Sequence, residues 1–150
     1  MRLIETLARL KRTGQPVWRT ADVMAHFGLD KAHASQLMAR LADSGHLVRI
    51  KRGLWVFPAE VEPMVLGEYL TAPFPSYVSL QTALYHHSMV SQIPAVVYCV
   101  SIARTRLYRT PLGTYSIHHV APSFFFGFEP VGGIKVATPE KALVDVLGAE

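Results

Sequence analysis

The chain has 150 residues, half of them hydrophobic, which is enough to bury a core but leaves room for at most two small domains. The formal net charge of +4 is unevenly placed: residues 1–57 hold ten Lys or Arg against four Asp or Glu, and residues 58–150 hold five against seven. A basic first third joined to a slightly acidic remainder indicates a polyanion-binding module beside a domain with another role.

Cysteine usage and hydropathy exclude several protein classes. Cys99 is the sole cysteine, which excludes a disulfide framework and a cysteine-based zinc site, and its apolar neighbours indicate a reduced core residue. Charged residues interrupt the N-terminal stretch, which therefore lacks the pattern of a secretory signal. The longest apolar run, from Ile93 to Ala103, is too short to span a bilayer. We therefore expect a soluble, cytoplasmic protein without a membrane partner.

The first third begins with two predicted helices. In the first, apolar residues recur at helical spacing and are expected to face inward: Leu3, Ile4, Leu7 and Leu10. Gly14 and Pro16 end this helix. Thr20 is the expected N-cap of the second helix, in which the inward residues are Val23, Met24 and Phe27. Gly28 then makes a turn to a third helix, at the spacing of a helix-turn-helix.

The third predicted helix starts at its cap, Asp30, and ends at Gly45. Its apolar stripe consists of Ala34, Leu37, Met38 and Leu41. A helical wheel puts on the opposite face Ala32, Ser35, Gln36, Ala39 and Arg40, with His33 on the flank. This face suits a DNA major groove, because the alanines admit close approach while Gln36 and Arg40 can form bidentate contacts with adenine and guanine edges. Lys31 and Ser35 lie near the helix N-terminus, where phosphate is favoured.

A two-stranded ribbon follows this helix at once. The sequence predicts strands over 46–50 and 54–57, joined by a tip of Lys51, Arg52 and Gly53. A helix followed by a basic hairpin is typical of a winged helix-turn-helix, whose tip contacts the phosphate backbone or the minor groove. Two alternatives stay open: the bases form only a solvated face, or the module docks a protein. The predicted DNA-binding residues are Lys31, His33, Ser35, Gln36, Arg40, Arg49, Lys51 and Arg52.

After a proline-bounded linker over 58–63, the pattern predicts helices over 64–72 and 80–90, with Ser79 as the cap of the second and Leu80, Leu84 and Met89 inward. Five short strands follow, over 96–102, 107–110, 115–120, 123–126 and 134–137. Thr138 caps a last helix, whose expected inward residues are Leu143, Val146 and Leu147. The predicted fold is therefore α+β: an N-terminal winged helix-turn-helix over 1–58 and a small mixed α/β C-terminal domain over 64–150.

Residue patterns that would carry other chemistry are weak. His86–His87 and His118–His119 are adjacent pairs, whose members diverge on a helix or a strand and so do not chelate one metal ion by themselves. Phosphate-binding glycine loops and the nucleophile elbow G-x-S-x-G are absent from the sequence. The run Phe124–Phe126 with Phe128 is interpreted as core rather than as a base-stacking platform. We therefore predict no enzyme, no cofactor and no metal site.

Several motifs nevertheless indicate a family. They are KRGLWVF in the ribbon, YVSLQTALYHHSMVSQIP over 77–94, RTPLGTYSIHHVAPSFFFGF over 109–128 and IKVATPEKALVDVL over 134–147. With these motifs the chain resembles the AbiEi-type antitoxins of bacterial abortive-infection (type IV) toxin–antitoxin systems and their solitary regulator relatives. The A-T-P-E-K-A-L-x-D segment is the most specific part of the resemblance. Relatives usually continue with further helices after the position of Asp145, so we expect a shortened relative or a truncated chain here.

The resemblance implies a function for each part of the chain. The winged helix is expected to bind double-stranded operator DNA and to repress its own operon, with the DNA face on residues 31–40 and on Lys51 and Arg52. The C-terminal domain is expected to counter a nucleotidyltransferase-type toxin, without a stable direct complex. The alternative is a protein-interaction module whose C-terminal domain binds a toxin or another regulator, with DNA binding secondary.

Overall fold

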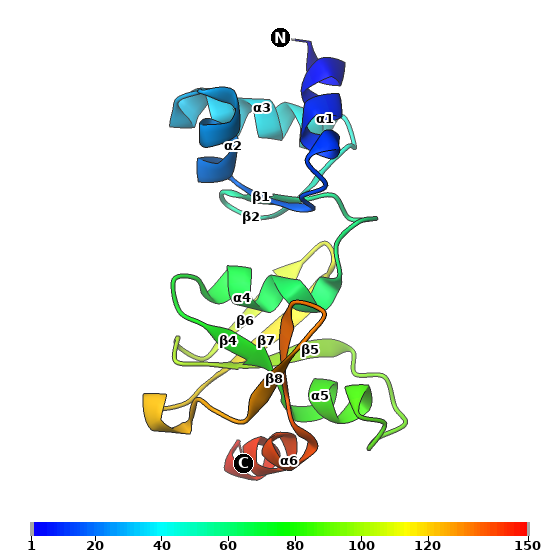
Figure 1. Ribbon diagram of the computed structural model, residues 1–150, viewed down its shortest axis with the longest axis vertical. Helices are drawn as coiled ribbons and strands as arrows, with labels where there is room; N and C mark the ends of the chain where they lie inside the picture. The colour runs from blue at the N-terminus through cyan, green and yellow to red at the C-terminus, as the bar shows by residue number, and fades with distance from the viewer. Residues whose placement is uncertain (1, 150) are drawn as a thin grey trace. The chain divides into compact units, whose positions relative to one another are not determined.

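The computed structural model describes residues 2–149 as a mixed α+β protein, with six α-helices and two β-sheets in that range (Figure 1). The chain divides into two compact units, Met1–Val61 and Glu62–Glu150, here called unit 1 and unit 2. Each unit has its own hydrophobic core. Among the described residues, no helix combines the length and the apolar character that a bilayer crossing requires.

Unit 1 contains three helices and one small sheet. Its elements are α1 (Leu3–Arg12), β1 (Val17–Arg19), α2 (Thr20–Phe27), α3 (Lys31–Asp43), β2 (Val48–Lys51) and β3 (Leu54–Val56). The sheet is antiparallel with the order β1-β3-β2, and Trp18 of β1 stands opposite Trp55 of β3. Both indoles pack with Val23, Met38 and Leu41 in one buried cluster, so the sheet and the helices share a core.

The third helix is confirmed with its cap and its stripe. The backbone N–H of His33 donates to Asp30 Oδ1 over 2.8 Å, which satisfies one of the unpaired donors of the first turn. Ala34, Met38 and Leu41 are fully buried, and Leu37 packs against the same cluster. The predicted pattern therefore identifies the core side of α3.

Two predictions for unit 1 are wrong, and one strand was not predicted. Ile4 is 72% exposed, and Thr6 is buried in its place, with its hydroxyl satisfied by the carbonyl of Arg2 over 3.1 Å. Thr20 is the first residue of α2 and not its cap; the N-cap is Arg19, whose N–H donates to Asp22 Oδ2 over 2.9 Å. Strand β1 was not predicted; its three residues show little alternation.

The ribbon forms with a shorter tip than predicted. Lys51 is the last residue of β2 and pairs with Leu54, so only Arg52 and Gly53 form the turn. Gly53 has φ = 79°, a left-handed conformation that glycine adopts without steric cost. Its carbonyl accepts the N–H of Thr20, which ties the ribbon to the start of α2. The register shifts between Arg49 and Lys51, which places a bulge at Ile50.

Unit 2 is built around a mixed sheet of six strands. Its elements are the 3₁₀ turn η1 (Pro63–Val65), α4 (Leu66–Thr71), β4 (Ser76–Val78), α5 (Leu80–His86), β5 (Val96–Ser101), β6 (Arg106–Thr110), β7 (Gly113–His119), η2 (Pro122–Phe124), β8 (Phe128–Val131), β9 (Ile134–Ala137) and α6 (Pro139–Gly148). The strand order is β6-β7-β5-β4-β9-β8. Helix α4 lies on one side of the sheet, and α5 and α6 lie on the other (Figure 1).

The elements of unit 2 differ from the prediction in several places. The helix predicted over 64–72 is divided into η1 and α4, and α5 ends at His86, which leaves Met89 45% exposed. Residues 123–126 do not form a strand, because η2 occupies Pro122–Phe124. Strands β4 and β8, of three and four residues, were not predicted. Cys99 is buried in the core, as predicted.

The inward residues predicted for α6 are wrong for Leu143 and Leu147 and confirmed for Val146, which packs against the core of unit 2. Leu143, Val144 and Leu147 are 45%, 55% and 73% exposed, while Lys141 and Asp145 are buried. The Thr138 cap is confirmed, because its hydroxyl accepts the N–H of Lys141. The prediction followed the hydrophobicity of the leucines. In the structure, Tyr77 and Ser79 bind Asp145 and so hold its face of α6 inside.

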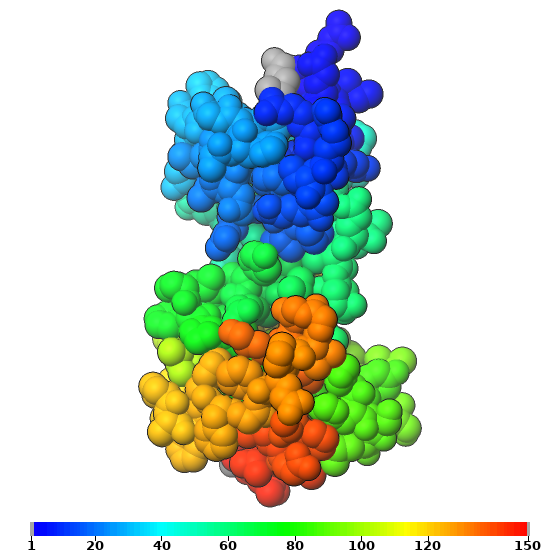
Figure 2. All heavy atoms as spheres, in the orientation of Figure 1, coloured from blue at the N-terminus to red at the C-terminus, as the bar shows by residue number. Residues whose placement is uncertain are grey.

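The phenylalanine run lies beside α6. Figure 2 shows this segment in gold against the red helix. Phe125 packs edge-on against Tyr77, and Phe128 stacks on the same ring, as core residues do. The prediction of a core position is wrong for Phe124 and Phe126, which are 58% and 54% exposed.

Candidate nucleic-acid interface

The connection between α2 and α3 is a compact turn in unit 1. Gly28 has φ = 66° and ends α2, and the N–H of Leu29 donates to the carbonyl of Met24. Asp30 then starts α3. The pKa of the Asp30 carboxyl is held below its ordinary value, first by the hydrogen bond from the His33 backbone and then by the imidazole of His33. The two helices are thus joined by one glycine, one apolar residue and one capping acid.

The face of α3 that points away from the core carries most of the predicted DNA contacts. Lys31, Gln36 and Arg40 are exposed, whereas Ser35 is half-buried. His33 is exposed, with Nδ1 lying 3.0 Å from Asp30 Oδ1, so its ring contacts the helix cap. The small exposed residues between them are Ala32 and Ala39. This face offers a guanidinium and an amide over a surface without bulky side chains.

The ribbon supplies the remaining predicted residues. Arg49 and Arg52 are exposed, and Lys51 is half-buried. Helix α3 contacts β2 directly, so the ribbon and the helix belong to the same packed body. Six of the eight predicted residues are therefore exposed on unit 1; Ser35 and Lys51 are the two that are less accessible.

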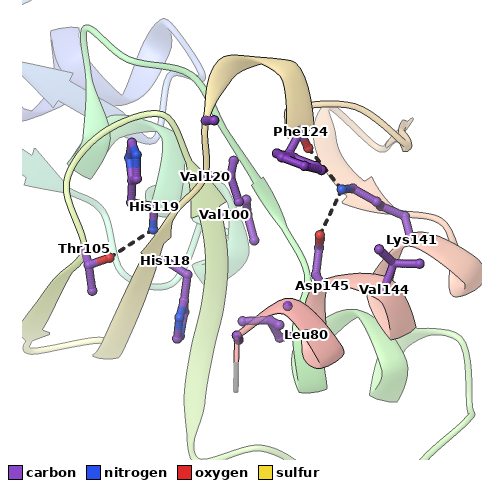
Figure 3. A pocket seen from close by; sticks show the side chains of 13 residues that line it. Leu80, Val100, Thr105, His118, His119, Val120, Phe124, Lys141, Val144 and Asp145 are labelled. Carbon is purple, nitrogen blue, oxygen red and sulfur yellow. Dashed lines mark hydrogen bonds and ion pairs between the residues drawn. The ribbon is translucent and has the colours of Figure 1, made fainter.

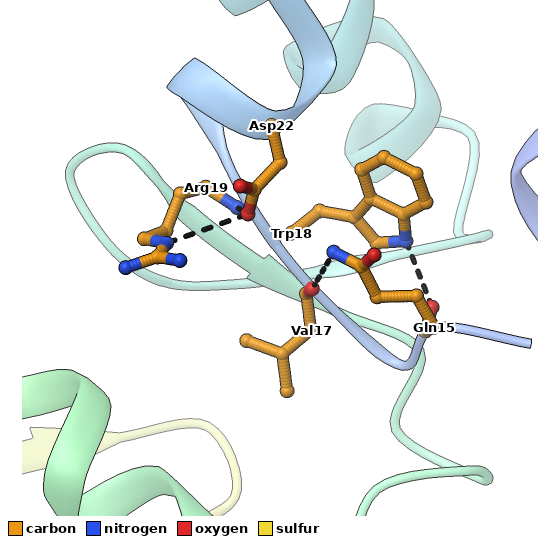
Figure 4. A network of polar contacts seen from close by, with 5 residues as sticks. All are labelled: Gln15, Val17, Trp18, Arg19 and Asp22. Atoms are coloured by element: carbon orange, nitrogen blue, oxygen red, sulfur yellow. Dashed lines mark hydrogen bonds and ion pairs between the residues drawn. The ribbon is translucent and has the colours of Figure 1, made fainter. Parts of the chain in front are cut away.

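Some of the positive charge of unit 1 is engaged within the unit itself. The guanidinium of Arg9 lies 4.5 Å from the centroid of the Phe27 ring, and Lys11 Nζ lies 5.9 Å from that of Phe57. Arg19 Nε contacts Asp22 Oδ2 over 3.4 Å (Figure 4). These three side chains contribute to the field of the unit, but they also stabilise its fold.

A second candidate site is a cavity of about 570 Å³ in unit 2. It opens between β5, β7, α6 and the segment after β7, and Figure 3 shows its lining. Val100, Val120 and Val144 give it apolar walls, and His118 comes from β7. The cavity has the size of small-molecule sites, which are typically 300–1,000 Å³.

A buried ion pair forms part of the cavity wall. Lys141 Nζ lies 2.9 Å from Asp145 Oδ1 and donates to the carbonyl of Phe124 over 3.0 Å (Figure 3). Tyr77 Oη and Ser79 Oγ both donate to Asp145 Oδ2, over 2.9 and 2.6 Å. Burial, followed by the bond to Asp145, raises the pKa of Tyr77 above its ordinary value. The carboxylate is thus compensated on both oxygens, and it links α6 to the sheet.

This cluster was missed by the sequence reasoning. Ser79 stands at the N-cap position of α5, but its hydroxyl donates to Asp145 and does not cap the helix. The available signal was a lysine and an aspartate at i, i+4 spacing within an otherwise apolar helix, a pair that packing can bury together. Ser79 is fully buried, which keeps its hydroxyl away from solvent.

The histidines take separate positions. The ring of His87 bonds through Nε2 to the carbonyl of Ala137, and His119 Nδ1 lies 3.2 and 3.0 Å from the carbonyls of Ile102 and Ala103. Within residues 2–149 no group of three or more His, Cys, Asp or Glu side chains could hold a metal ion.

No family model matches the chain, and no curated protein sequence matches it.

Proposed function

We propose that unit 1 is a winged helix-turn-helix that binds double-stranded DNA in a sequence-specific manner and represses transcription. The observation that supports this function is the order of elements in unit 1. A glycine turn joins α2 to α3, α3 presents Gln36 and Arg40 to solvent, and a two-stranded ribbon with Arg52 in its turn follows. In such modules the second helix reads the major groove and the ribbon contacts the phosphate backbone.

Within this proposal the residues have two kinds of role. Gln36 and Arg40 read base edges, because an amide suits adenine and a guanidinium suits guanine. Lys31, Arg49, Lys51 and Arg52 contact phosphates, and His33 and Ser35 contribute near the N-terminus of α3.

The experiment compares binding to the upstream DNA of the protein's own gene with binding to random DNA of the same length. We expect the upstream fragment to bind more tightly, and Arg40→Lys to reduce that preference at a cost of about 1–3 kcal/mol, because lysine keeps the charge but loses the bidentate fork. Arg52→Gln should weaken both complexes equally. Equal affinity of the unchanged protein for both DNAs would refute the proposal.

The resemblance to AbiEi-type antitoxins extends the proposal to a toxin–antitoxin operon. In this role the protein represses its own promoter and counters a nucleotidyltransferase-type toxin encoded beside it. Co-expression with that neighbouring gene tests the role: growth should be restored by the unchanged protein, and an α3 variant that no longer binds the promoter should still restore it when both genes are driven by foreign promoters.

A second candidate function is protein interaction through unit 2. The exposed apolar side chains of α6, with Leu147 at 73%, favour it. Co-purification with the product of the neighbouring gene, lost in Leu147→Glu, would support this function over a purely DNA-directed role.

A further inference from the structure

One face of the sheet in unit 2 carries a set of polar and aromatic side chains that the proposed DNA contacts do not use. Val100 and His118 both line the cavity, and they are register partners on β5 and β7. Side chains alternate along a strand, and directly opposed residues share a face. Tyr98 and its partner Ser116 therefore lie on the same face. Strand β6 pairs with β7 and places Leu107 opposite Ser116 and Arg109 opposite Thr114, so Leu107 and Arg109 lie on this face too.

This face is open at the β6 edge. Leu107 is 49% exposed, Arg109 is exposed, and Tyr98, Ser116 and His118 are half-buried. Helix α5 packs on β5 and α6 packs on β9, whereas neither helix packs mainly on β6 or β7, so the face is least covered towards the β6 edge. We call this surface, made of Tyr98, Leu107, Arg109, Ser116 and His118, the open sheet face. It continues into the cavity, because His118 belongs to both.

The charge around the open sheet face has one sign. The sequence contains no Asp or Glu between Glu68 and Glu129. The same stretch contains Arg109 on this face and Arg104 just before β6, both exposed. A surface with Arg109 and without an acid attracts a polyanion, and the carboxylate in the adjoining cavity, Asp145, is paired with Lys141.

The aromatic side chains indicate which polyanion. The rings of Tyr98 and His118 have centroids 6.0 Å apart and planes inclined by 38°, so they form a short tilted pair on adjacent strands. Aromatic rings on an open sheet face, with arginines beside them, are the arrangement on which unpaired bases stack. We propose that the open sheet face binds single-stranded nucleic acid, with bases stacked on Tyr98 and His118, Arg109 on the backbone and one base in the adjoining cavity.

The same observations disfavour an acidic protein segment as the occupant. Arginines alone would serve an acidic peptide, but a partly exposed tyrosine–histidine pair and a cavity of about 570 Å³ next to it suit planar bases. Duplex DNA is also a poor occupant, because its bases are stacked on each other and expose no ring surface to Tyr98. The site is independent of the surface of α3.

The test measures binding of the full chain to a labelled oligouridylate of about 12 nucleotides by fluorescence anisotropy. We expect Tyr98→Ala to weaken binding about tenfold and Tyr98→Phe to leave it within about twofold, because stacking requires the ring and not the hydroxyl. His118→Ala gives a second reading of stacking. Arg109→Gln should weaken binding about threefold or more and reduce the steepness of its salt dependence by about 0.7 in log units.

Arg106→Gln is the matched control, since Arg106 lies on the same strand but pairs with Ile117 and therefore faces the other side of the sheet. It should change binding less than twofold. Thermal unfolding of each variant checks that the fold persists. Absence of oligouridylate binding, equal losses in Arg106→Gln and Arg109→Gln, or displacement by polyglutamate as effective as displacement by unlabelled oligonucleotide would overturn the proposal. Loss caused by Arg40→Lys or Arg52→Gln would also overturn it, by placing the oligonucleotide on unit 1.

Discussion

Two tryptophans in one core differ in a single hydrogen bond. Trp18 Nε1 donates to the carbonyl of Gln15 over 2.8 Å (Figure 4), whereas Trp55 Nε1 is buried and has no partner among the described residues. A buried donor without a partner costs about 1–3 kcal/mol of stability. The two indoles are opposite each other in the sheet and similarly buried, so they form a natural comparison.

We expect Trp18→Phe to destabilise unit 1 by about 1–3 kcal/mol more than Trp55→Phe. Both variants lose a comparable volume, but the first loses the hydrogen bond to the Gln15 carbonyl and the second removes a buried, unsatisfied N–H. Urea unfolding, followed by the fluorescence of the remaining tryptophan, measures the difference. Equal losses in the two variants would show that the volume of the ring, and not its N–H, determines the effect.

For the ion pair of Lys141 and Asp145, we expect that removing one charge costs more stability than removing both. Asp145→Asn should cost about 3–5 kcal/mol, because it leaves the Lys141 ammonium buried without its counter-charge. The double change Lys141→Met with Asp145→Asn should be better tolerated than Asp145→Asn alone, since neither charge then remains and the amide oxygen can still accept from Tyr77 and Ser79. Chemical denaturation of the three proteins provides the measurement. A double variant less stable than Asp145→Asn would contradict the prediction.

The stability of unit 2 should fall at alkaline pH, because two buried acidic groups, the Cys99 thiol and the Tyr115 phenol, resist ionisation in the folded chain. Burial raises the pKa of Cys99 to about 12, and burial, followed by the charges of Cys99 and Glu62, raises that of Tyr115 to about 12. In the unfolded chain these groups ionise near pH 9 and pH 10. The contribution of these two protonated groups to the free energy of unfolding is therefore complete below about pH 9 and is lost as pH rises towards 12. In Cys99→Ala the decline in stability should begin about one pH unit higher. Urea midpoints measured across this pH range test the shift. An unchanged onset of the decline would contradict the prediction.

At the scale of an element, α4 depends on one glycine. A Cβ on Gly67 would lie 2.6 Å from the Sγ of Cys99 in β5, which is closer than packed atoms approach. Alanine normally stabilises a helix relative to glycine by about 1 kcal/mol. We expect Gly67→Ala to destabilise the protein instead, and Cys99→Ala to relieve the clash in the double variant. Gly148→Ala in α6 is the control, since nothing lies within 4 Å of the added Cβ. Additive effects in the double-mutant cycle would disprove the contact.

The elements also show what the sequence could and could not predict. Helix α3 was predicted with its cap and buried stripe because Asp30 and the spacing of Ala34, Met38 and Leu41 are local signals. Strands of three or four residues carry little alternation, and of these β1, β4 and β8 were missed while β2, β3 and β9 were predicted. The inward face of α6 was wrong for Leu143 and Leu147, though not for Val146, because Tyr77 and Ser79, more than sixty positions away, bind Asp145 and turn it inward. The exposed residues of the candidate interface followed from the wheel, whereas the cluster at Asp145 depends on contacts that exist only in the folded chain.

For the whole molecule, the uneven charge predicts how DNA binding responds to salt. Unit 1 carries the basic excess, and four of its side chains are assigned to phosphates: Lys31, Arg49, Lys51 and Arg52. Each neutralised phosphate of duplex DNA contributes about −0.9 to the slope of log K against log salt. The protein should therefore show a slope of about −3 to −4.

Substitutions then separate the roles of the charges. Lys51→Gln and Arg52→Gln should each make the slope less steep by about one and weaken specific and random DNA alike, because phosphate contacts carry no sequence information. Arg40→Lys should leave the slope unchanged and lower only the preference for the specific site. Arg109→Gln in unit 2 should change neither quantity for duplex DNA. Titrations across a salt series provide all four slopes, and a slope that Arg52→Gln does not alter would remove the ribbon from the DNA interface.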